Sequence, residues 1–329
     1  PTSRPTAKAR FSSNACSSSG EFKKRMMDFA AMWAGTGDQL DRIMKAQTRQ
    51  LKTVEPIKFT GYSPRHEAWV LGDIAVHKGR MLKINSEDYF DIGSRAVKIQ
   101  SKARMLDINY DPDQLRFDWL DDLWTAWGPE GLVTLAFFAM SLFAVQIRKK
   151  QDSIGFLEIT GDPGSGKTTL IVFLWKLFGR SEYEGFDPNK GTPSYISRKF
   201  MEGSGLPAGL IEGNRGESDG GRGGNFRQFD WAELLVLYNG RNPRGLAVKT
   251  SDNQVHEPPF LGTIYLMQNS PIDAMPAVLE RIMPITIDKS RWSTTTTAAA
   301  ERIADIPMED VSGTIVHIAR QEEKFLDRY

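Results

Sequence analysis

The chain has 329 residues, 40% of them hydrophobic and 25% charged, with a formal net charge of +1 at pH 7. This length and apolar content are enough to bury one or two cores, and the balanced charge excludes a global basic field that would attract nucleic acid, so any such binding must be local. Cys16 is the only cysteine of the sequence, which excludes an internal disulfide framework and predicts a reducing, cytoplasmic environment.

The first 53 residues divide into a linker and a helical element. Residues 1–20 are rich in serine, with three basic residues and no acidic one, and they predict a flexible linker. Residues 21–53 carry apolar side chains at helical spacing with a break near Gly35-Thr36-Gly37, which predicts two helices. Since the sequence opens on Pro1 rather than Met, we expect it to be the C-terminal part of a longer protein.

Residues 54–150 predict a small α+β module. The stretch EAWVLGDIAVHKGRMLKI, residues 67–84, alternates apolar and polar side chains around a Gly-Arg turn at 79–80, which predicts a hairpin. Helical periodicity follows from Asp118 to Gln146. The apolar run 131–147 is shorter than the ~20 residues of a membrane span and polar side chains interrupt it, so it predicts a buried core helix and no membrane association.

From Ile154 onward the pattern alternates between strands and helices. The predicted order is strand, glycine-rich loop, helix, short strand, helix, strand, helix, hairpin and strand. This alternation is typical of an α/β domain with a mostly parallel sheet, which we assign to residues 151–329.

A glycine-rich segment opens this domain. Residues 161–168, GDPGSGKT, fit the phosphate-binding pattern G-x-x-x-x-G-K-[ST] in full, between a strand candidate and an apolar helix that ends at Gly179. In such a loop the glycines let backbone N–H groups close around phosphate oxygens at a helix N-terminus, the lysine reaches the β- and γ-phosphates, and the threonine hydroxyl ligates Mg²⁺. The segment therefore predicts ATP and Mg²⁺ as cofactors; a glycine-rich turn that contains the pattern by chance is the alternative. The predicted ATP contacts are Gly161, Asp162, Pro163, Gly164, Ser165, Gly166, Lys167, Thr168 and Thr169.

Two strand candidates further along the chain end in polar side chains. The apolar run 206–211 ends at Glu212, where a hydrolytic P-loop protein holds the carboxylate that polarises the attacking water. The run 262–267 ends in Gln268 and Asn269, and an amide there is placed to hydrogen-bond the γ-phosphate or to orient the water. Ordinary turn chemistry before Pro271 explains the same amides.

Basic side chains near these strands predict further contacts. Arg281, on a short helix, is a candidate arginine finger for the ATP of a neighbouring subunit, and a surface pair with Glu280 is the alternative. Residues 229–260 predict a helix capped by Gly240 and then a hairpin, with Lys249 and His256 flanking its tip. Such a hairpin suits a phosphate backbone, while a solvated surface explains the same two side chains.

These segments together resemble the motif series of superfamily 3 helicases, which are ring-forming AAA+ motors of viruses, phages and mobile elements. The residues that carry the resemblance are, in chain order, GDPGSGKT, LIEG, LYNGRNPRGLAVK, YLMQN and LERI. The phrases FLEITGDPGSGKTTL, FLWKLFGR and YEGFDPNK, with GYSPRHEAWVLGDIAVHKG upstream, are similar to the C-terminal helicase part of phage- and prophage-type Toprim-domain primase–helicases. The resemblance covers about residues 60–320.

The resemblance implies a P-loop AAA+ domain that works as an ATP-dependent DNA helicase or translocase in a hexameric ring, with ATP between subunits. Glu212 would activate water and, with Thr168, hold Mg²⁺, while Asn269 would sense the γ-phosphate and Arg281 would be donated in trans. Hairpins with Arg244, Lys249 and His256 would line the channel and move single-stranded DNA. The helices at 21–53 would form a collar or oligomerisation element, and any primase domain would lie upstream of residue 1.

The sequence departs from the helicase pattern in two places, which keeps other functions open. Two adjacent acids are usual where this chain has Ile211-Glu212-Gly213, and a Gly-Gly-Asp is expected where it has Asn239-Gly240-Arg241. A P-loop fold that has lost hydrolysis is therefore one alternative. An AAA+ ATPase that remodels a protein partner is another, and a small-molecule P-loop kinase with Arg241 and Arg244 in its lid is the third.

Overall fold

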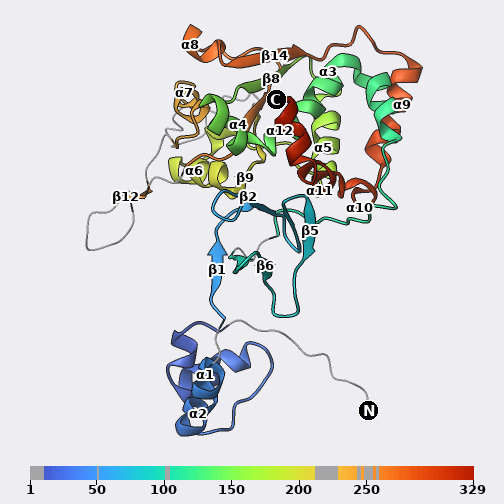
Figure 1. Cartoon of the computed structure of the whole chain (residues 1–329). Coiled ribbons are helices and arrows are strands. Elements are labelled where there is room, and N and C mark those ends of the chain that lie inside the picture. The colour runs from blue at the N-terminus through green and yellow to red at the C-terminus, as the bar shows by residue number, and fades with distance from the viewer. Residues whose placement is uncertain are drawn as a thin grey trace. The chain divides into compact units, whose positions relative to one another are not determined.

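The computed structural model describes residues 11–49, 52–100, 104–211, 229–242, 246–247, 255–256 and 259–329 (Figure 1). The chain divides into two compact units, residues 1–53 and 54–329.

The first unit contains two capped helices. The Ser18 side chain accepts a hydrogen bond from the Glu21 backbone N–H at 3.2 Å at the first helix, and Thr36 with Gln39 forms a capping box at the second. The sequence predicts two helices over this stretch, and two form, separated by residues 28–36. The helical elements are η1 (Asn14–Cys16), α1 (Ser19–Met27) and α2 (Gly37–Thr48).

The second unit begins with two small sheets, in the strand orders β1-β7-β6 and β5-β4-β3-β2-β9. The predicted hairpin is β4–β5, but His77 pairs with Arg80, so Lys78 and Gly79 make the turn rather than Gly79 and Arg80. Both turn residues have positive φ, which glycine adopts without strain. The strands are β1 (Val54–Ile57), β2 (Thr60–Ser63), β3 (Ala68–Val70), β4 (Ile74–His77), β5 (Arg80–Lys83), β6 (Phe90–Ile92), β7 (Arg95–Ile99) and β9 (Gly203–Ser204).

The helix predicted from Asp118 to Gln146 forms as two helices, α3 (Trp119–Ser141) and α4 (Ala144–Gln151). Gly128 has non-helical dihedral angles (φ 58°, ψ −140°) and Pro129 follows it, so α3 is kinked there. Phe138, Leu142 and Phe143 of the apolar run are fully buried. In the described ranges no single helix is long and apolar enough to cross a membrane; α3 and α4 meet that test only as a pair, which is bent by 82°.

A four-stranded parallel sheet forms the centre of the second unit, in the order β10-β13-β8-β14. The α/β organisation expected for this part of the chain is therefore confirmed. The short strand expected between the first two helices is reduced to one parallel bridge, Phe186 to Leu210. The strands are β8 (Phe156–Thr160), β10 (Pro207–Ile211), β13 (Thr263–Met267) and β14 (Ile282–Thr286), and the helices and 3₁₀ turn between them are α5 (Lys167–Leu177), η2 (Pro188–Lys190), α6 (Pro193–Glu202), α7 (Glu233–Tyr238) and α8 (Pro276–Leu279).

Helices cover both faces of this sheet (Figure 1). One apolar cluster joins α5 to α3 through Trp127, Leu170 and Trp175 among others. The other joins α6 and α7 to the opposite face through side chains such as Phe200 and Leu237. With both faces covered, the loops that follow the carboxyl ends of the strands are where a parallel sheet of this kind binds ligands.

The predicted hairpin between α7 and β13 is present as two short antiparallel strands, with Leu246 paired to His256. Their bounds are β11 (Leu246–Ala247) and β12 (Val255–His256).

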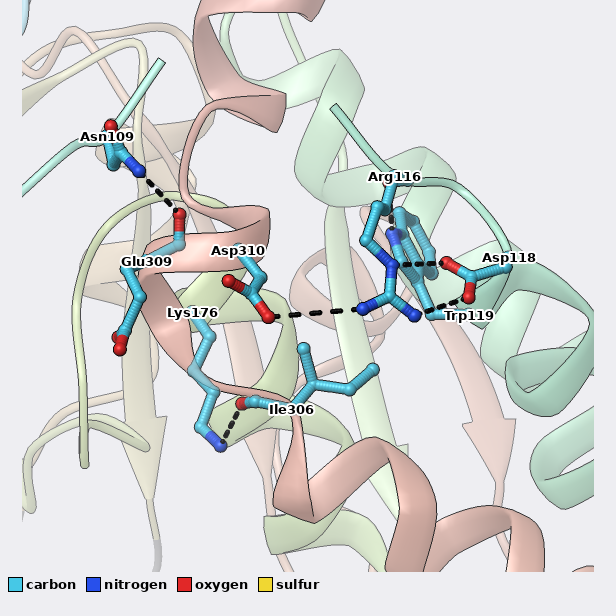
Figure 2. Close-up of polar contacts among 8 residues, drawn as sticks. All are labelled: Asn109, Arg116, Asp118, Trp119, Lys176, Ile306, Glu309 and Asp310. Atoms are coloured by element: carbon cyan, nitrogen blue, oxygen red, sulfur yellow. Dashed lines mark hydrogen bonds and ion pairs between the residues drawn. The ribbon is translucent and has the colours of Figure 1, made fainter. Parts of the chain in front are cut away.

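Helices at the C-terminus, which the sequence analysis leaves unassigned, pack against α3 and α5. Figure 2 shows polar contacts that connect them: Lys176 Nζ of α5 donates to the Ile306 carbonyl at 2.9 Å, and Arg116 lies 3.9 Å from Asp310. Lys176 also donates to the Ala304 carbonyl at 2.6 Å, so α9 is held at its end beside α5. The helices are α9 (Thr294–Asp305), α10 (Met308–Val311), α11 (Thr314–Ala319) and α12 (Glu322–Arg328).

Candidate functional site

The loop between β8 and α5 is closed by three glycines with positive φ. Gly161, Gly164 and Gly166 have φ of 143°, 74° and 92°. A Cβ atom on Gly161 would collide with the Ile287 carbonyl oxygen, so no larger residue fits there without movement of the backbone. The Ser165 N–H donates to the Asp162 carbonyl at 3.1 Å within the loop. The loop therefore has the compact, glycine-dependent backbone of a phosphate cradle at a helix N-terminus.

Lys167 is buried at the mouth of this loop. Its Nζ donates to the carbonyl oxygens of Gly161 at 2.5 Å and Asp162 at 2.9 Å, and lies 3.4 Å from Asn269 Oδ1. Burial lowers the pKa of the Lys167 ammonium, the Asp162 charge opposes that shift, and the nearby Lys289 adds to it. In the described part of the chain the acceptors near this ammonium are neutral, and a partly desolvated ammonium gains from a charged phosphate oxygen as its partner.

A cavity of about 570 Å³ opens over the loop. This volume lies within the range of small-molecule sites. Its wall has three parts: the P-loop with the ends of β10 and β13, the first part of α3, and α9 with the segment before it. The lining residues are Ala126, Trp127, Pro163, Gly164, Ser165, Gly166, Lys167, Thr168, Thr169, Glu184, Ile211, Met267, Gln268, Asn269, Trp292, Thr296, Thr297, Ala300, Glu301 and Ala304.

Gln268 and Asn269 reach this cavity because β13 lies directly beside β8. The Gln268 N–H donates to the Ile159 carbonyl at 3.0 Å, which fixes the end of β13 at the level where β8 enters the P-loop. Gln268 Nε2 and Ser165 Oγ are buried in the cavity wall, and neither has a hydrogen-bond partner in the described part of the chain. Buried polar groups are nearly always paired, so both atoms fit a ligand that brings hydrogen-bonding groups.

Arg281 lies at the opposite edge of the sheet. Its carbonyl accepts from the Phe156 N–H at 2.9 Å, at the start of β8, whereas the P-loop follows the end of that strand. The guanidinium lies over the Tyr238 ring, 5.0 Å from its centroid, and donates to the Ala277 carbonyl. The structure therefore brings Lys167, Thr168 and Asn269 together and keeps Arg281 away from the site of its own chain.

For other predicted site residues, the structure does not describe the side chain. Glu212, Arg244 and Lys249 lie outside the described residues. Of His256 the backbone is described, in β12. Ile211, the neighbour of Glu212, lines the cavity.

Several residues in the cavity wall or beside it carry no signal in the sequence. Trp127 lies against the P-loop, with its Nε1 3.1 Å from the position a Cβ on Gly166 would take. Lys289 Nζ lies 3.8 Å from the corresponding position on Gly164 and 5.1 Å from the Trp292 ring centroid. Trp127 comes from α3, and Lys289 and Trp292 come from the segment before α9; no local pattern in the sequence marks them.

Comparison with solved structures supports the α/β fold described above. No protein-family model matches the sequence, and no curated protein matches it. Among solved structures, an SCCmec type IV Cch active helicase is similar at a TM-score of 0.54 and 10% identity, over 96% of this chain and 56% of that one. The NrS-1 C-terminal region is similar at a TM-score of 0.38 and 11% identity (84% and 67% covered), and a JCV helicase at 0.34 and 13% (64% and 59% covered).

The similarity to the SCCmec helicase shows the fold of this chain. It is an α/β fold that occurs in a helicase, with a parallel central sheet and helices on both of its faces. The chain spans 56% of the length of that helicase.

Proposed function

We propose that this chain is the ATP-hydrolysing motor of a DNA helicase or translocase, of the superfamily 3 AAA+ type found in phages and mobile elements. The observation that carries the proposal is the position of Lys167: a buried ammonium between the Gly161 carbonyl and Asn269, at the mouth of a glycine cradle. A triphosphate would supply charged oxygens as direct partners of this ammonium, whose acceptors in the described part of the chain are neutral.

The residues of the cavity fit ATP with Mg²⁺. The positive φ of Gly161, Gly164 and Gly166 suits a loop whose N–H groups face phosphate oxygens, and the buried Ser165 hydroxyl suits a phosphate oxygen. Thr168 would hold Mg²⁺, which when bound neutralises charge on the β- and γ-phosphates. Lys167 would bind the phosphates, Asn269 would hydrogen-bond the γ-phosphate, and Glu212 would take a proton from the attacking water.

The position of Arg281 supports a ring. In its own chain Arg281 lies at the start of β8, away from the P-loop, so as an arginine finger it would serve the ATP of a neighbouring subunit. Copies related by rotation form such head-to-tail contacts when they close into a ring. The proposed assembly is a hexamer, with hairpins that include Arg244, Lys249 and His256 gripping single-stranded DNA.

The small-molecule kinase alternative fits the structure less well. Its lid would need Arg241 over the phosphates. Arg241 follows α7, and the Tyr238 carbonyl in α7 accepts from the Ile154 N–H, at the N-terminal edge of the sheet. Arg241 does not line the cavity in the described part of the chain.

The test is the mass of the particle in solution with ATP and Mg²⁺, with and without single-stranded DNA, together with the rate of ATP hydrolysis. We expect a six-fold mass and hydrolysis that DNA stimulates. Lys249→Ala should remove the stimulation by DNA and leave basal hydrolysis in place. A monomer that phosphorylates a metabolite and ignores DNA would overturn the proposal, and hydrolysis stimulated by a protein but not by DNA would favour the remodelling ATPase.

A further inference from the structure

Two acidic residues line the nucleotide cavity in the described part of the chain, Glu184 and Glu301. They lie on different walls. Glu301 is exposed on α9. Glu184 lies on the segment that pairs with β10, the strand that leads into Glu212. One acidic residue of the cavity lining thus comes from a segment that no catalytic or binding motif in the sequence marks.

The backbone around Glu184 is fixed to the end of β10. The Phe186 N–H donates to the Gly209 carbonyl at 2.9 Å, and the Ile211 N–H donates to the Phe186 carbonyl at 3.0 Å. Gly185, which lies between Glu184 and Phe186, has φ 134°. A Cβ on this residue would lie 2.8 Å from the Gly209 carbonyl oxygen, so the close approach of the two backbones requires glycine.

A buried tyrosine holds Glu184 from the other side. The Tyr265 hydroxyl of β13 donates to the Glu184 carbonyl at 2.7 Å and accepts from Trp175 Nε1 at 2.9 Å. Burial raises the pKa of Tyr265 well above its ordinary value, so its phenol stays protonated and keeps donating. The main chain beside Glu184 is therefore anchored to two neighbouring strands of the central sheet, and Glu184 lines the same cavity as Ile211 and Met267 at the ends of these strands.

We propose that Glu184 is a second carboxylate of the metal–nucleotide site, where it would hold Mg²⁺ together with Thr168, directly or through a metal-bound water. This inference rests on the proposed ATP and Mg²⁺ function. Mg²⁺ keeps several waters and is usually bound through one or two carboxylates with substrate phosphates. The helicase pattern has two adjacent acids on the strand where this chain has Glu212 alone, and Glu184 supplies the missing charge from the paired segment.

The experiment measures the affinity of the full chain for a fluorescent non-hydrolysable ATP analogue, first in EDTA and then across a Mg²⁺ titration. Glu184→Gln keeps the shape of the side chain and removes its charge. We expect its metal-free affinity to stay within about twofold of wild type, which shows that the fold and the phosphate cradle are intact. The Mg²⁺ concentration that gives half of the gain in affinity should rise about 10- to 100-fold, the usual range for groups that support a metal.

Glu301→Gln is the matched control, because it removes a carboxylate from the other wall of the same cavity. Its Mg²⁺ titration should follow that of wild type. A Glu184→Gln titration that superimposes on wild type would overturn the inference, and so would an equal shift in Glu301→Gln, which would indicate a general field of the cavity. If wild type itself binds no nucleotide, the proposed function fails first; if wild type binds and only the Glu184→Gln shift is missing, the inference alone fails.

Discussion

Asn269 Oδ1 lies 3.4 Å from Lys167 Nζ, and this contact joins the end of β13 to the first residue of α5. The two side chains come from segments about 100 residues apart in the sequence, and the pairing of β13 with β8 brings them together. The proposed phosphate lysine at the start of α5 and the proposed γ-phosphate amide after β13 are thereby placed within contact distance of each other.

Substitution of Lys167 should remove nucleotide binding, whereas substitution of Asn269 should mainly lower the rate of hydrolysis. Lys167→Ala is expected to abolish nucleotide binding, because the buried ammonium is the main positive charge on the phosphates. Asn269→Ala should leave nucleotide affinity nearly unchanged and lower kcat about 10²- to 10³-fold, the usual loss when one donor to a transition-state charge is removed. Equilibrium binding and steady-state hydrolysis measure the two effects. Ser270→Ala, at the exposed next position, is the control, and an equal loss of affinity in Asn269→Ala would contradict the separation of roles.

Arg281 should act on a neighbouring subunit. Arg281→Ala is expected to bind nucleotide like wild type and to lose about 10³- to 10⁵-fold in hydrolysis. Mixing Arg281→Ala subunits with Lys167→Ala subunits should restore part of the activity, because a Lys167→Ala subunit still carries the arginine that its neighbour needs.

The ATPase activity of the mixed preparation also distinguishes donation of Arg281 to a neighbouring subunit from a role within its own chain. Mixtures that stay inactive, or Arg281→Ala protein that hydrolyses ATP normally, would count against donation in trans. Arg302→Ala is the control, since Arg302 is an exposed arginine that pairs with Asp122 and has no place in the proposed ring contact.

Trp292 should contact the base of the nucleotide. It is 55% exposed and lines the cavity on the α9 side, and Lys289 Nζ lies 5.1 Å from the centroid of its ring. An aromatic side chain that stacks on a base contributes about 1–3 kcal/mol, so Trp292→Ala should weaken ATP binding about 5- to 150-fold. Binding of inorganic triphosphate, which has no base, should change little.

Trp124→Ala is the matched control for this prediction. Trp124 is 53% exposed on α3 and does not line the cavity. Nucleotide should quench tryptophan fluorescence in wild type and in Trp124→Ala, and less in Trp292→Ala. Equal losses for ATP and triphosphate would show that Trp292 supports the cavity wall and not the base.

Gly161 should be the least replaceable glycine of the loop. Its φ of 143° and the carbonyl of Ile287 leave no room for a Cβ, so Gly161→Ala should lower the unfolding free energy by about 1–3 kcal/mol. Gly155→Ala is the comparison: it lies one residue before β8, has no positive φ, and its Cβ would meet the Arg281 carbonyl at an ordinary 3.4 Å. Denaturant unfolding of the two variants tests the difference, and equal midpoints would contradict it.

The glycine-rich loop between β8 and α5 and the central sheet could be predicted because their signals are local. The G-x-x-x-x-G-K-[ST] pattern lies within eight residues, and the strands are continuous apolar runs such as those ending at Ile211 and Met267. Other parts of the cavity lining depend on packing between distant segments. The helix α9 joins the lining because it packs against α3 and α5, and Glu184 joins it because its segment pairs with β10. These contacts join segments that are far apart in the sequence, so no local sequence pattern predicts them.

Two local predictions were wrong in detail for the same reason. The single helix expected over Asp118–Gln146 breaks at Gly128 and again before α4, although its apolar pattern continues through both breaks. The expected short strand near Phe186 pairs through one bridge, because Gly185 and the Asp187 turn leave little extended backbone on either side. Apolar periodicity reports burial and does not by itself fix where the backbone bends.

Glu158 should set the position of the turn that carries Asn269. This carboxylate is buried in the middle of β8, 3% exposed, and its Oε1 accepts from the Ile272 N–H at 2.7 Å. Glu158→Ala leaves the Ile272 N–H without its acceptor, so it should lower the unfolding free energy by about 1–3 kcal/mol. Because Asn269 lies on the same turn, the substitution should also reduce kcat more than nucleotide affinity. Glu158→Gln keeps an acceptor oxygen and should recover most of both losses.

The pH dependence of the unfolding free energy provides a separate test of the role of Glu158. Burial raises the pKa of its carboxyl above the ordinary value, and the Ile272 N–H opposes that shift only in part. The folded state therefore holds this proton to higher pH than the unfolded state, so the Glu158 contribution to stability is present below the ordinary glutamate pKa and is lost as pH rises through the raised one. Wild type should lose unfolding free energy across that window relative to Glu158→Gln, which has no proton to lose there. Parallel curves of unfolding free energy against pH for the two proteins would show that Glu158 does not titrate with folding.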